Sequence, residues 1–435
     1  MKKVLILAYD FPPYVSVGGL RPYSWYKYFH EYDIYPVVVT RQWDNKYGNH
    51  LDYIAAGESN NTIIEETEFG TIIRTPYKPN LSNRLLLKYG VNKFKLIRKS
   101  ITAYYELMQF LFFVGTKSGL YYGAKEYLKN NEVDLIIGTG EPFILFKYAS
   151  KLSKKFNVPW IADYRDPWTQ NKSRSSNILK QRFNSFFEKK YVNTSSCFTT
   201  VSEFFSNSIK LLVPNKSFHI IENGFDSEKI NDNKDIAQNS ETMCVAFVGT
   251  IYSWHPLEEF IETYLQFSKN KQNVQLNFYG INNPERLTAI LPPNYKDKIK
   301  IYAKLDNNKL ISELYKNNIM LLFNYYHVIG TKIYDYLAIK RKILFCFSEQ
   351  ETKYHCKYPY SVKQTKGINS HLQENLLKKT NAGIVVKNSK HLLLTLDELY
   401  AEFEENRSID CNSIGIEKYS RKHQASKMSD IIKSI

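Results

Sequence analysis

The sequence predicts an α/β protein made of two Rossmann-like, doubly wound domains. Its 435 residues exceed the usual size of one compact core, which favours two domains. Short runs of Val, Ile, Leu and Phe alternate with longer segments of helical or mixed character. This alternation is typical of parallel strands that are buried on both faces of a sheet. It occurs twice, once on each side of a polar segment.

The predicted strands form two groups. The first half of the chain has apolar runs at 4–8, 37–40, 71–74, 133–137, 160–162, 198–201 and 219–221. The second half has them at 244–248, 274–278, 299–302, 319–323, 343–347 and 384–386. Each group is long enough to build one sheet, and the helices between its strands would cover both faces.

Segment 227–242 separates the two groups and is polar, without Trp or Tyr, as linkers often are. We therefore predict a first domain over 1–226, a linker over 227–242 and a second domain over 243–412. Residues 413–435 place a few apolar side chains among Lys and Arg and predict a C-terminal helix that crosses back. We expect the two sheets to face each other across a cleft, with ligands at the carboxyl ends of the strands.

Composition excludes several classes of protein. With 43% hydrophobic and 23% charged residues, the chain is not typical of a disordered, collagen-like or coiled-coil protein. Its five cysteines include no CxxC pair, which argues against a disulfide framework or a zinc cluster and favours a cytoplasmic protein. The most apolar stretch, 107–114, is far shorter than the ~20 residues that span a bilayer.

The net charge of +16 is unevenly distributed. Residues 69–105 contain eight Lys or Arg and no Asp or Glu. Such a surface suits anionic lipid headgroups, nucleic acid or phosphorylated ligands, and a solvated basic face without a partner is the alternative. No zinc finger, RNP-like strand or other nucleic-acid motif is present, so we expect no nucleic-acid partner.

The loops after the first and fifth strands of the first domain carry candidate binding residues. Gly18 and Gly19 leave backbone N–H groups free at the start of a predicted helix, although a simple turn would need the same residues. We expect Asp163, Arg165 and Asp166 to lie in the loop after the fifth strand, beside Trp168, whose indole could stack on a sugar. The alternative is an Arg165 ion pair that only fixes the loop.

The second domain repeats this pattern. Gly249 and Thr250 follow its first strand. Further on, Lys332 and Asp335 lie in the first turn of a predicted helix, where a lysine beside free N–H groups can bind a diphosphate and a carboxylate can reach a ribose diol. A surface Lys332–Asp335 pair is the alternative.

Seven segments together resemble the retaining GT-B glycosyltransferases of family 4, in particular bacterial members that build capsules, lipopolysaccharide and exopolysaccharide. The segments cover nearly the whole chain: YDFPPYVSVGGLR, DLIIGTGEP, PWIADYRDPW, FTTVSEFF, HIIENGFD, VAFVGTIYSWHPLEEFI and GTKIYDYLAIKRKIL. The resemblance implies the GT-B fold and transfer of a sugar from a nucleotide-diphosphate sugar, with UDP favoured. The chain departs from the family pattern at His327, which takes the first acidic position of E-x7-E, and at Lys340–Lys342, which replaces Gly-Lys-Pro.

The resemblance also implies roles for individual residues. The candidate catalytic residues are Asp163, Arg165, Asp166 and Lys332. The candidate substrate-binding residues are Gly18, Gly19, Arg21, Glu141, Trp168, Asn223, Gly224, Gly249, Thr250, His327, Thr331 and Asp335. In this family the departing phosphate is commonly proposed to help deprotonate the acceptor, so no pair of catalytic carboxylates is required. No DxD motif lies between the halves, and we expect neither a metal ion nor another cofactor.

We therefore predict a hexosyl- or N-acetylhexosaminyl-type transferase that acts on a lipid-linked or saccharide acceptor with retention, in cell-surface polysaccharide biosynthesis. Residues 84–99 mix six basic with several apolar residues and predict a helix that could hold the protein peripherally on the inner leaflet of the cytoplasmic membrane. Ordinary burial of that helix is the alternative. Two other functions stay open: an epimerase-like GT-B nucleotide-sugar enzyme, and a binding paralogue without activity.

Overall fold

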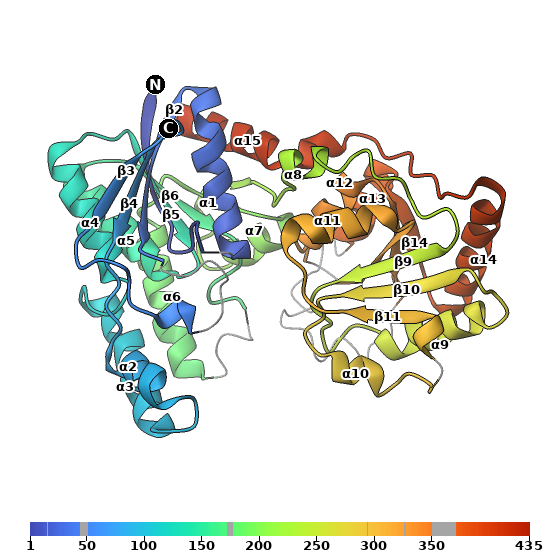
Figure 1. Cartoon of the computed structure of the whole chain (residues 1–435). Coiled ribbons are helices and arrows are strands. Elements are labelled where there is room, and N and C mark those ends of the chain that lie inside the picture. Colours follow the sequence, from blue (N-terminus) through green and yellow to red (C-terminus); the bar gives the residue numbers. More distant parts are fainter. Residues whose placement is uncertain (15, 44–50, 172–176, 294, 326–327, 350–370) are drawn as a thin grey trace. The chain divides into compact units, whose positions relative to one another are not determined.

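The computed structural model describes the chain except residues 15, 44–50, 172–176, 294, 326–327 and 350–370. The chain forms two compact units (Figure 1). The first unit comprises Met1–Glu222 and Lys422–Ile435, and the second comprises Asn223–Arg421. Each unit is an α/β layer structure around its own sheet.

The first unit contains an eight-stranded sheet in the order β3-β4-β2-β1-β5-β6-β7-β8. All neighbouring strands are parallel except β3 and β4. The strands are β1 (Lys2–Leu7), β2 (Ile34–Arg41), β3 (Ile63–Glu66), β4 (Thr71–Thr75), β5 (Leu135–Gly140), β6 (Trp160–Tyr164), β7 (Cys197–Thr200) and β8 (Phe218–Ile220). The helices are α1 (Val17–Tyr28), α2 (Leu81–Tyr89), α3 (Lys95–Leu111), α4 (Ser118–Asn130), α5 (Ile144–Phe156), α6 (Ile178–Val192), α7 (Glu203–Lys210) and α15 (Arg421–Ser434).

Strand β1 shows why this sheet is apolar throughout. Successive side chains of a strand point to opposite faces. Leu5 and Leu7 enter a core with α4 and α5 on one face, while Val4 and Ile6 enter a core with α1 and α15 on the other. A strand buried on both faces needs a continuous apolar run, and this is the pattern that the sequence displays.

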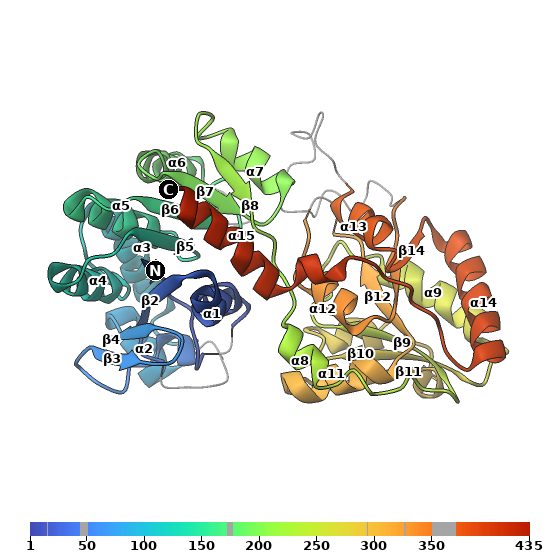
Figure 2. The ribbon, with the colours of Figure 1, turned by 90° about the horizontal axis from the view of Figure 1, so that it is seen from above.

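Helix α15 completes the first unit, although it ends the chain (Figure 2). Its apolar residues Met428 and Ile432 are fully buried in the core that Val4 and Ile6 share. The Lys2 ammonium also donates a hydrogen bond to the Ile432 carbonyl oxygen at 3.0 Å. The last helix is therefore a structural part of the unit that the N-terminus begins.

The second unit contains a six-stranded, fully parallel sheet in the order β11-β10-β9-β12-β13-β14. The strands are β9 (Met243–Val248), β10 (Val274–Tyr279), β11 (Ile299–Tyr302), β12 (Ile319–Phe323), β13 (Lys342–Cys346) and β14 (Gly383–Val386). The helices are α8 (Ser227–Asn231), α9 (Leu257–Ser268), α10 (Pro284–Thr288), α11 (Asn307–Lys316), α12 (Lys332–Ile339), α13 (Leu372–Thr380) and α14 (Ser389–Asn406). Helices α9 and α14 pack on one face, and α11, α12 and α13 pack on the other.

Strand order reverses at one place in each sheet. Strand β1 lies between β2 and β5, and β9 lies between β10 and β12. In open parallel sheets, ligands bind outside the carboxyl ends of the strands at such a switch point. The loops after β1, β5, β9 and β12 are therefore the places to look for a site.

The predicted α/β class with two parallel-sheet domains is confirmed, and each of the thirteen predicted strands is present. The short antiparallel edge strand β3 was missed, because IIEE carries two acidic residues and only four positions. Two local predictions were wrong. Gly90, at φ 76°, interrupts the helix predicted over 84–99, so α2 and α3 form a hairpin. Strand β6 runs on to Tyr164, which puts Asp163 inside the strand rather than in the loop.

Among the described helices, none combines the length and the apolar character that crossing a bilayer requires.

Replacing Met428 by Ala tests the role of α15. The cavity should destabilise the first unit by about 2–5 kcal/mol. Hydrogen exchange should therefore become faster in peptides from β1 and stay unchanged in peptides from β9. Leu394→Ala, at an exposed position of α14, is the matched control and should change neither. Equal acceleration in both units would contradict the assignment of α15 to the first unit.

Candidate functional site

The loop after β1 and the start of α1 bring charged groups against a glycine. The Ser16 hydroxyl accepts a hydrogen bond from the Gly18 amide at 2.9 Å and donates one to Asp10 Oδ2 at 2.7 Å. A Cβ on Gly18 would collide with the Arg165 guanidinium and with Asp10 Oδ2. On Gly19, it would lie 3.2 Å from the Asp10 carbonyl oxygen. Because these glycines have no Cβ, the Asp10 carboxylate and the Arg165 guanidinium can lie against the N-terminus of α1. A simple turn would not need this space.

Asp10 is a candidate residue that our sequence analysis missed. Burial raises the pKa of its carboxyl, although the Ser16 hydrogen bond and the Arg165 charge act to lower it. Its Oδ1 atom is buried without a hydrogen-bond partner among the described residues. A buried acceptor without a donor costs free energy, so a ligand hydroxyl that reached Oδ1 would be stabilised there. The position of Asp10 just beyond the first strand was the signal that could have identified it.

Arg165 connects two strand-end loops. Its Nε donates to the Gly140 carbonyl oxygen at 2.9 Å, and its Nη2 donates to the Glu141 carbonyl oxygen at 3.1 Å. The side chain thus fixes the loop after β5 to the loop after β6. Asp166 follows in the same loop and is half-buried.

Arg21 and Asp163 form a buried ion pair in the first unit. Arg21 Nη2 lies 2.7 Å from Asp163 Oδ1, and Arg21 Nη1 donates to the Ile221 carbonyl oxygen at 2.6 Å. The Thr199 hydroxyl also donates to Asp163 Oδ1 at 2.7 Å. Asp163 is fully buried. These contacts give both residues a positioning role, because they connect α1, β6, β7 and the chain after β8.

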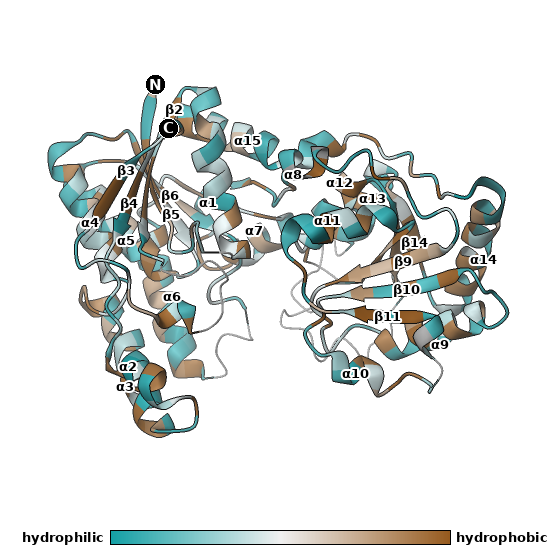
Figure 3. Cartoon of the chain, in the orientation of Figure 1, coloured by the Kyte–Doolittle hydropathy of each residue, from teal (hydrophilic) through white to brown (hydrophobic). Residues whose placement is uncertain are grey.

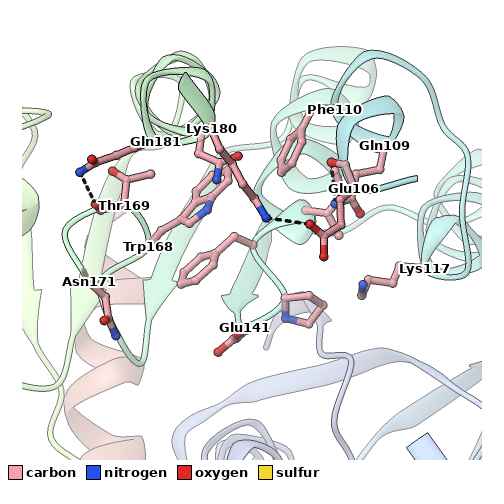
Figure 4. Close-up of a pocket in the computed structure, with 14 residues that line it drawn as sticks. Glu106, Gln109, Phe110, Lys117, Glu141, Trp168, Thr169, Asn171, Lys180 and Gln181 are labelled. Carbon is pink, nitrogen blue, oxygen red and sulfur yellow. Dashed lines mark hydrogen bonds and ion pairs between the residues drawn. The ribbon is translucent and has the colours of Figure 1, made fainter. Parts of the chain in front are cut away.

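Glu141 and Trp168 line one pocket of the first unit, which has a volume of about 230 Å³ (Figure 4). The Trp168 ring packs parallel to Phe143, with centroids 5.1 Å apart, and stacks on Phe110 at 5.4 Å. Trp168 is mostly buried between these rings and forms part of the pocket wall. Glu141 is exposed at the pocket mouth.

Asn223 and Gly224 begin the second unit. A Cβ on Gly224 would lie 2.7 Å from the Tyr419 carbonyl oxygen and 2.9 Å from the Arg421 nitrogen. The neighbouring Phe225 amide donates to the Tyr419 carbonyl oxygen at 3.1 Å. Gly224 is therefore explained by close packing of two chain segments at this point.

In the second unit, Gly249 and Lys332 lie together at the switch point. Gly249 directly follows β9 and has φ 79°, a conformation that favours glycine. A Cβ at this position would lie 4.0 Å from Lys332 Cε, and Thr250 follows it half-buried. Lys332 is the first residue of α12, and its Nζ lies 3.9 Å from the centroid of the Phe247 ring. The structure thus assembles the predicted lysine and glycine at the N-terminus of one helix.

Lys332 is held in an environment that opposes its charge. Burial lowers its pKa to about 7. The Lys332 ammonium makes no hydrogen bond or ion pair with any residue that the structure describes, so the alternative of a surface pair with Asp335 is not observed. Buried His255 lies close enough for the charges of Lys332 and Arg286, together with burial, to hold its pKa well below the usual range. His255 therefore stays neutral at pH 7 and does not compete for an anion.

The other predicted residues of this region have different environments. Thr331 precedes α12 without forming a side-chain cap, and Asp335 is exposed in the first turn. His327 lies outside the described residues. Sequence analysis missed an aromatic stack beside the loop after β9, in which Tyr252 and Trp254 lie 4.5 Å apart and nearly parallel, with Tyr325 next to both.

Comparisons with known proteins identify the architecture. No protein-family model matches the sequence, and a search of curated proteins finds no match either. Solved structures match over the full length. Sucrose-phosphate synthase from Thermosynechococcus elongatus is 14% identical with a TM-score of 0.62, over 100% of this chain and 99% of that one. The chain has the GT-B fold.

Two further GT-B structures support this assignment. Anabaena HepE, in complex with UDP-glucose, is 11% identical with a TM-score of 0.53, and each chain is covered completely. The catalytic domain of starch synthase IV from Arabidopsis thaliana, bound to ADP and acarbose, is 12% identical with a TM-score of 0.56, over 100% of this chain and 99% of that one. At these identities the likeness concerns the fold alone.

Replacing Asp163 by Ala tests the buried ion pair. The change leaves the Arg21 charge buried without compensation, which should lower the free energy of unfolding by about 3–5 kcal/mol. Glu65→Ala is the matched control, because it removes the half-exposed partner of Arg74 and should cost less than about 1 kcal/mol. Urea denaturation followed by circular dichroism measures both. Similar losses for the two variants would show that the Arg21–Asp163 pair has no special structural role.

Proposed function

We propose that this GT-B chain is a glycosyltransferase that takes a sugar from a nucleotide-diphosphate sugar, with UDP favoured. We further propose a family 4-like enzyme of hexosyl or N-acetylhexosaminyl type that retains the anomeric configuration. Its acceptor would be a lipid-linked or saccharide molecule in cell-surface polysaccharide biosynthesis. The fold supports this proposal together with the seven motifs in the sequence, and the UDP-glucose bound to HepE supports the choice of donor.

The environment of Lys332 is the observation that carries the proposal. A desolvated lysine without a counter-ion is stabilised when a dianionic group approaches it. The N–H groups at the start of α12 point in the same direction and add to the positive potential. A nucleoside diphosphate leaves with growing negative charge, and Lys332 would stabilise that charge as it develops. In this proposal the positive charge comes from the protein, and no metal ion is needed.

The first unit would hold the acceptor. Asp10 offers a buried oxygen to an acceptor hydroxyl, and Arg165 keeps the loops after β5 and β6 in place. With retention, the departing phosphate would receive the proton of the attacking hydroxyl on the same face of the sugar. Asp10 would then orient the acceptor hydroxyl, which fits a carboxyl whose pKa is raised rather than lowered.

We also propose that the α2–α3 hairpin binds the anionic surface of the cytoplasmic membrane. All residues from Leu87 to Ile97 are exposed, and apolar and basic side chains are mixed among them (Figure 3). Leu96 and Ile97 have exposed fractions of 79% and 54%. Ser82 on α2 bonds to the Arg98 carbonyl oxygen at 3.1 Å and so holds the two helices together. Large exposed apolar side chains among lysines suit insertion at a lipid–water interface.

Lys332→Met tests the donor site. Loss of the charge should weaken UDP-glucose binding by about 2–5 kcal/mol, or roughly 30- to 5,000-fold in Kd, with sugar transfer reduced at least as much. Lys309→Met, at an exposed position of α11, is the control and should bind like the wild type. Isothermal titration calorimetry gives Kd. Unchanged affinity in Lys332→Met would contradict the proposal. If the wild type binds the donor tightly and converts it in the absence of acceptor, the protein is an epimerase. If it binds the donor without converting it, the protein is a silent paralogue.

The pH dependence of donor binding provides a separate test. Only protonated Lys332 attracts the diphosphate, and its pKa in the free protein is about 7. The Kd for UDP-glucose should therefore be constant below pH 7 and rise by up to about tenfold per pH unit above it. The rise in Kd should stop near the pKa of Lys332 in the donor-bound protein, which is higher than its pKa in the free protein. The diphosphate diester of UDP-glucose does not titrate in this range, and Lys332→Met should lack the slope. An identical slope in that variant would assign it to another group.

Leu96→Asp combined with Ile97→Asp tests the hairpin. Removal of two apolar side chains should reduce binding to vesicles rich in phosphatidylglycerol by roughly tenfold or more. High salt should weaken wild-type binding as well, because each basic residue contributes about 1 kcal/mol at an anionic surface. Vesicle sedimentation measures both effects, and Leu394→Asp, on α14, is the control. If the wild-type protein does not bind anionic vesicles, the membrane proposal is wrong, whereas the donor-site proposal is unaffected.

A further inference from the structure

We propose that the pocket in Figure 4 binds a phosphorylated acceptor, with Lys117 contacting its phosphate or diphosphate group and the remaining wall contacting its sugar. Only the identification of this ligand as the acceptor rests on the proposed function. All residues of the pocket belong to the first unit.

The pocket draws its walls from separate segments of the chain. Helix α3 supplies Glu106 and Phe110, and the loop after β5 supplies Glu141. Lys117 directly precedes α4, and Lys180 lies in the first turn of α6. The volume of about 230 Å³ is enough for one sugar ring or a phosphate-bearing group.

Lys117 is the pocket lysine that makes no ion pair with a described residue, although the Glu141 carboxylate also lines the pocket and acts on Lys117 through its charge. Glu106 is paired with Lys180, whose Nζ lies 2.9 Å from Glu106 Oε2. The Lys117 ammonium makes no hydrogen bond or ion pair with the residues that the structure describes. In Figure 4 its ammonium group lies apart from the Glu106–Lys180 pair. Burial lowers the pKa of Lys117, although the charges of Glu106 and Glu141 act in the opposite direction. An anion that enters the pocket would supply the partner that the protein does not.

The rest of the wall suits a sugar. Phe143 and Trp168 give it an aromatic surface, and Glu141 and Asn171 add groups that can bond to hydroxyls. Carboxylates, amides and aromatic rings are the usual polar and apolar contacts of a small-molecule site. A sugar that carries a phosphate would therefore use both parts of the pocket.

A buried carboxyl makes this wall rigid. Glu188, on α6, accepts hydrogen bonds from the Tyr164 hydroxyl at 2.9 Å, the Thr169 hydroxyl at 2.6 Å and the Thr169 amide at 3.2 Å. It is completely buried, and burial raises its pKa to about 7. The loop after β6 is thereby fixed before any ligand arrives, which reduces the entropic cost of binding.

Helix α3 also indicates the source of the phosphate. Its C-terminal half lines the pocket, and its N-terminal end belongs to the exposed tip of the hairpin. A protein that rests on lipid through that tip would have this pocket on the same helix, about ten residues, or roughly 15 Å, further along. We therefore favour a lipid-borne diphosphate over a free sugar phosphate.

The test uses the Lys332→Met background, so that phosphate binding at the donor site does not contribute. Glucose 1-phosphate, citronellyl diphosphate and neutral methyl glucoside are titrated by calorimetry. We expect at least one of the phosphorylated probes to bind tenfold or more tightly than methyl glucoside. Adding Lys117→Met should remove that preference, while Lys117→Arg should keep most of it. Lys129→Met, at an exposed site on α4, is the matched control and should behave like the background.

The outcomes separate this inference from the donor proposal. Equal binding of charged and neutral probes, or a preference that survives Lys117→Met in a protein with native circular dichroism, would overturn the inference. Tighter binding of citronellyl diphosphate than of glucose 1-phosphate would support the lipid source, and the reverse order would support a free sugar phosphate. Failure of UDP-glucose to bind the wild type would count against the donor site alone, because none of these titrations uses it.

Discussion

The reversal of strand order beside β1 and beside β9 determines where this chain can hold a ligand. Strands β9 and β12 pair through only two residue pairs, Ile319 with Val245 and Met320 with Ala246. Beyond them the rings of Phe247 and Phe323 have centroids 5.3 Å apart, and the Tyr336 hydroxyl of α12 accepts a hydrogen bond from the Val248 amide at the end of β9. Lys332 is therefore placed half-buried against an aromatic ring, that of Phe247. The same topology around β1 gathers Asp10, Gly18 and Arg165.

Each unit contains a half-buried lysine whose ammonium makes no hydrogen bond or ion pair with a described residue. Folding alone does not favour such a residue, because burial of an ammonium group without a partner costs free energy. Lys332 and Lys117 contrast with Lys147, which is 1% exposed and donates to two carbonyl oxygens at 2.7 Å. The contrast distinguishes a lysine that completes the fold from lysines that can meet an anionic ligand. Our proposal of phosphate binding in both units rests on this difference.

The sequence predicts the sheets well and the site in part. Strands buried on both faces need continuous apolar runs, so thirteen of them could be read directly, whereas β3, at an edge and half-exposed, leaves no such run. Lys332 and Gly249 were predictable because short motifs place them at strand ends. The partners of Asp163 and the lack of an ion pair at Lys117 could not be predicted, because they depend on contacts between distant segments. Arg21, for example, is 142 residues away from Asp163. Gly90 lies within residues 84–99, which were predicted to form one helix, yet its positive φ is a property of the folded turn.

The α2–α3 hairpin can expose its apolar tip because the other end of α3 is anchored. An isolated pair of short helices is marginally stable in water. Lys147, from α5, bonds to the carbonyl oxygens of Gln109 and Phe112, which the end of α3 leaves without helical partners. Burial lowers the pKa of Lys147 only to about 8, so it remains mostly charged at pH 7 and its positive charge is favourable at a helix C-terminus. Phe110 packs into the core at the same end. The anchor and the pocket therefore share one end of α3.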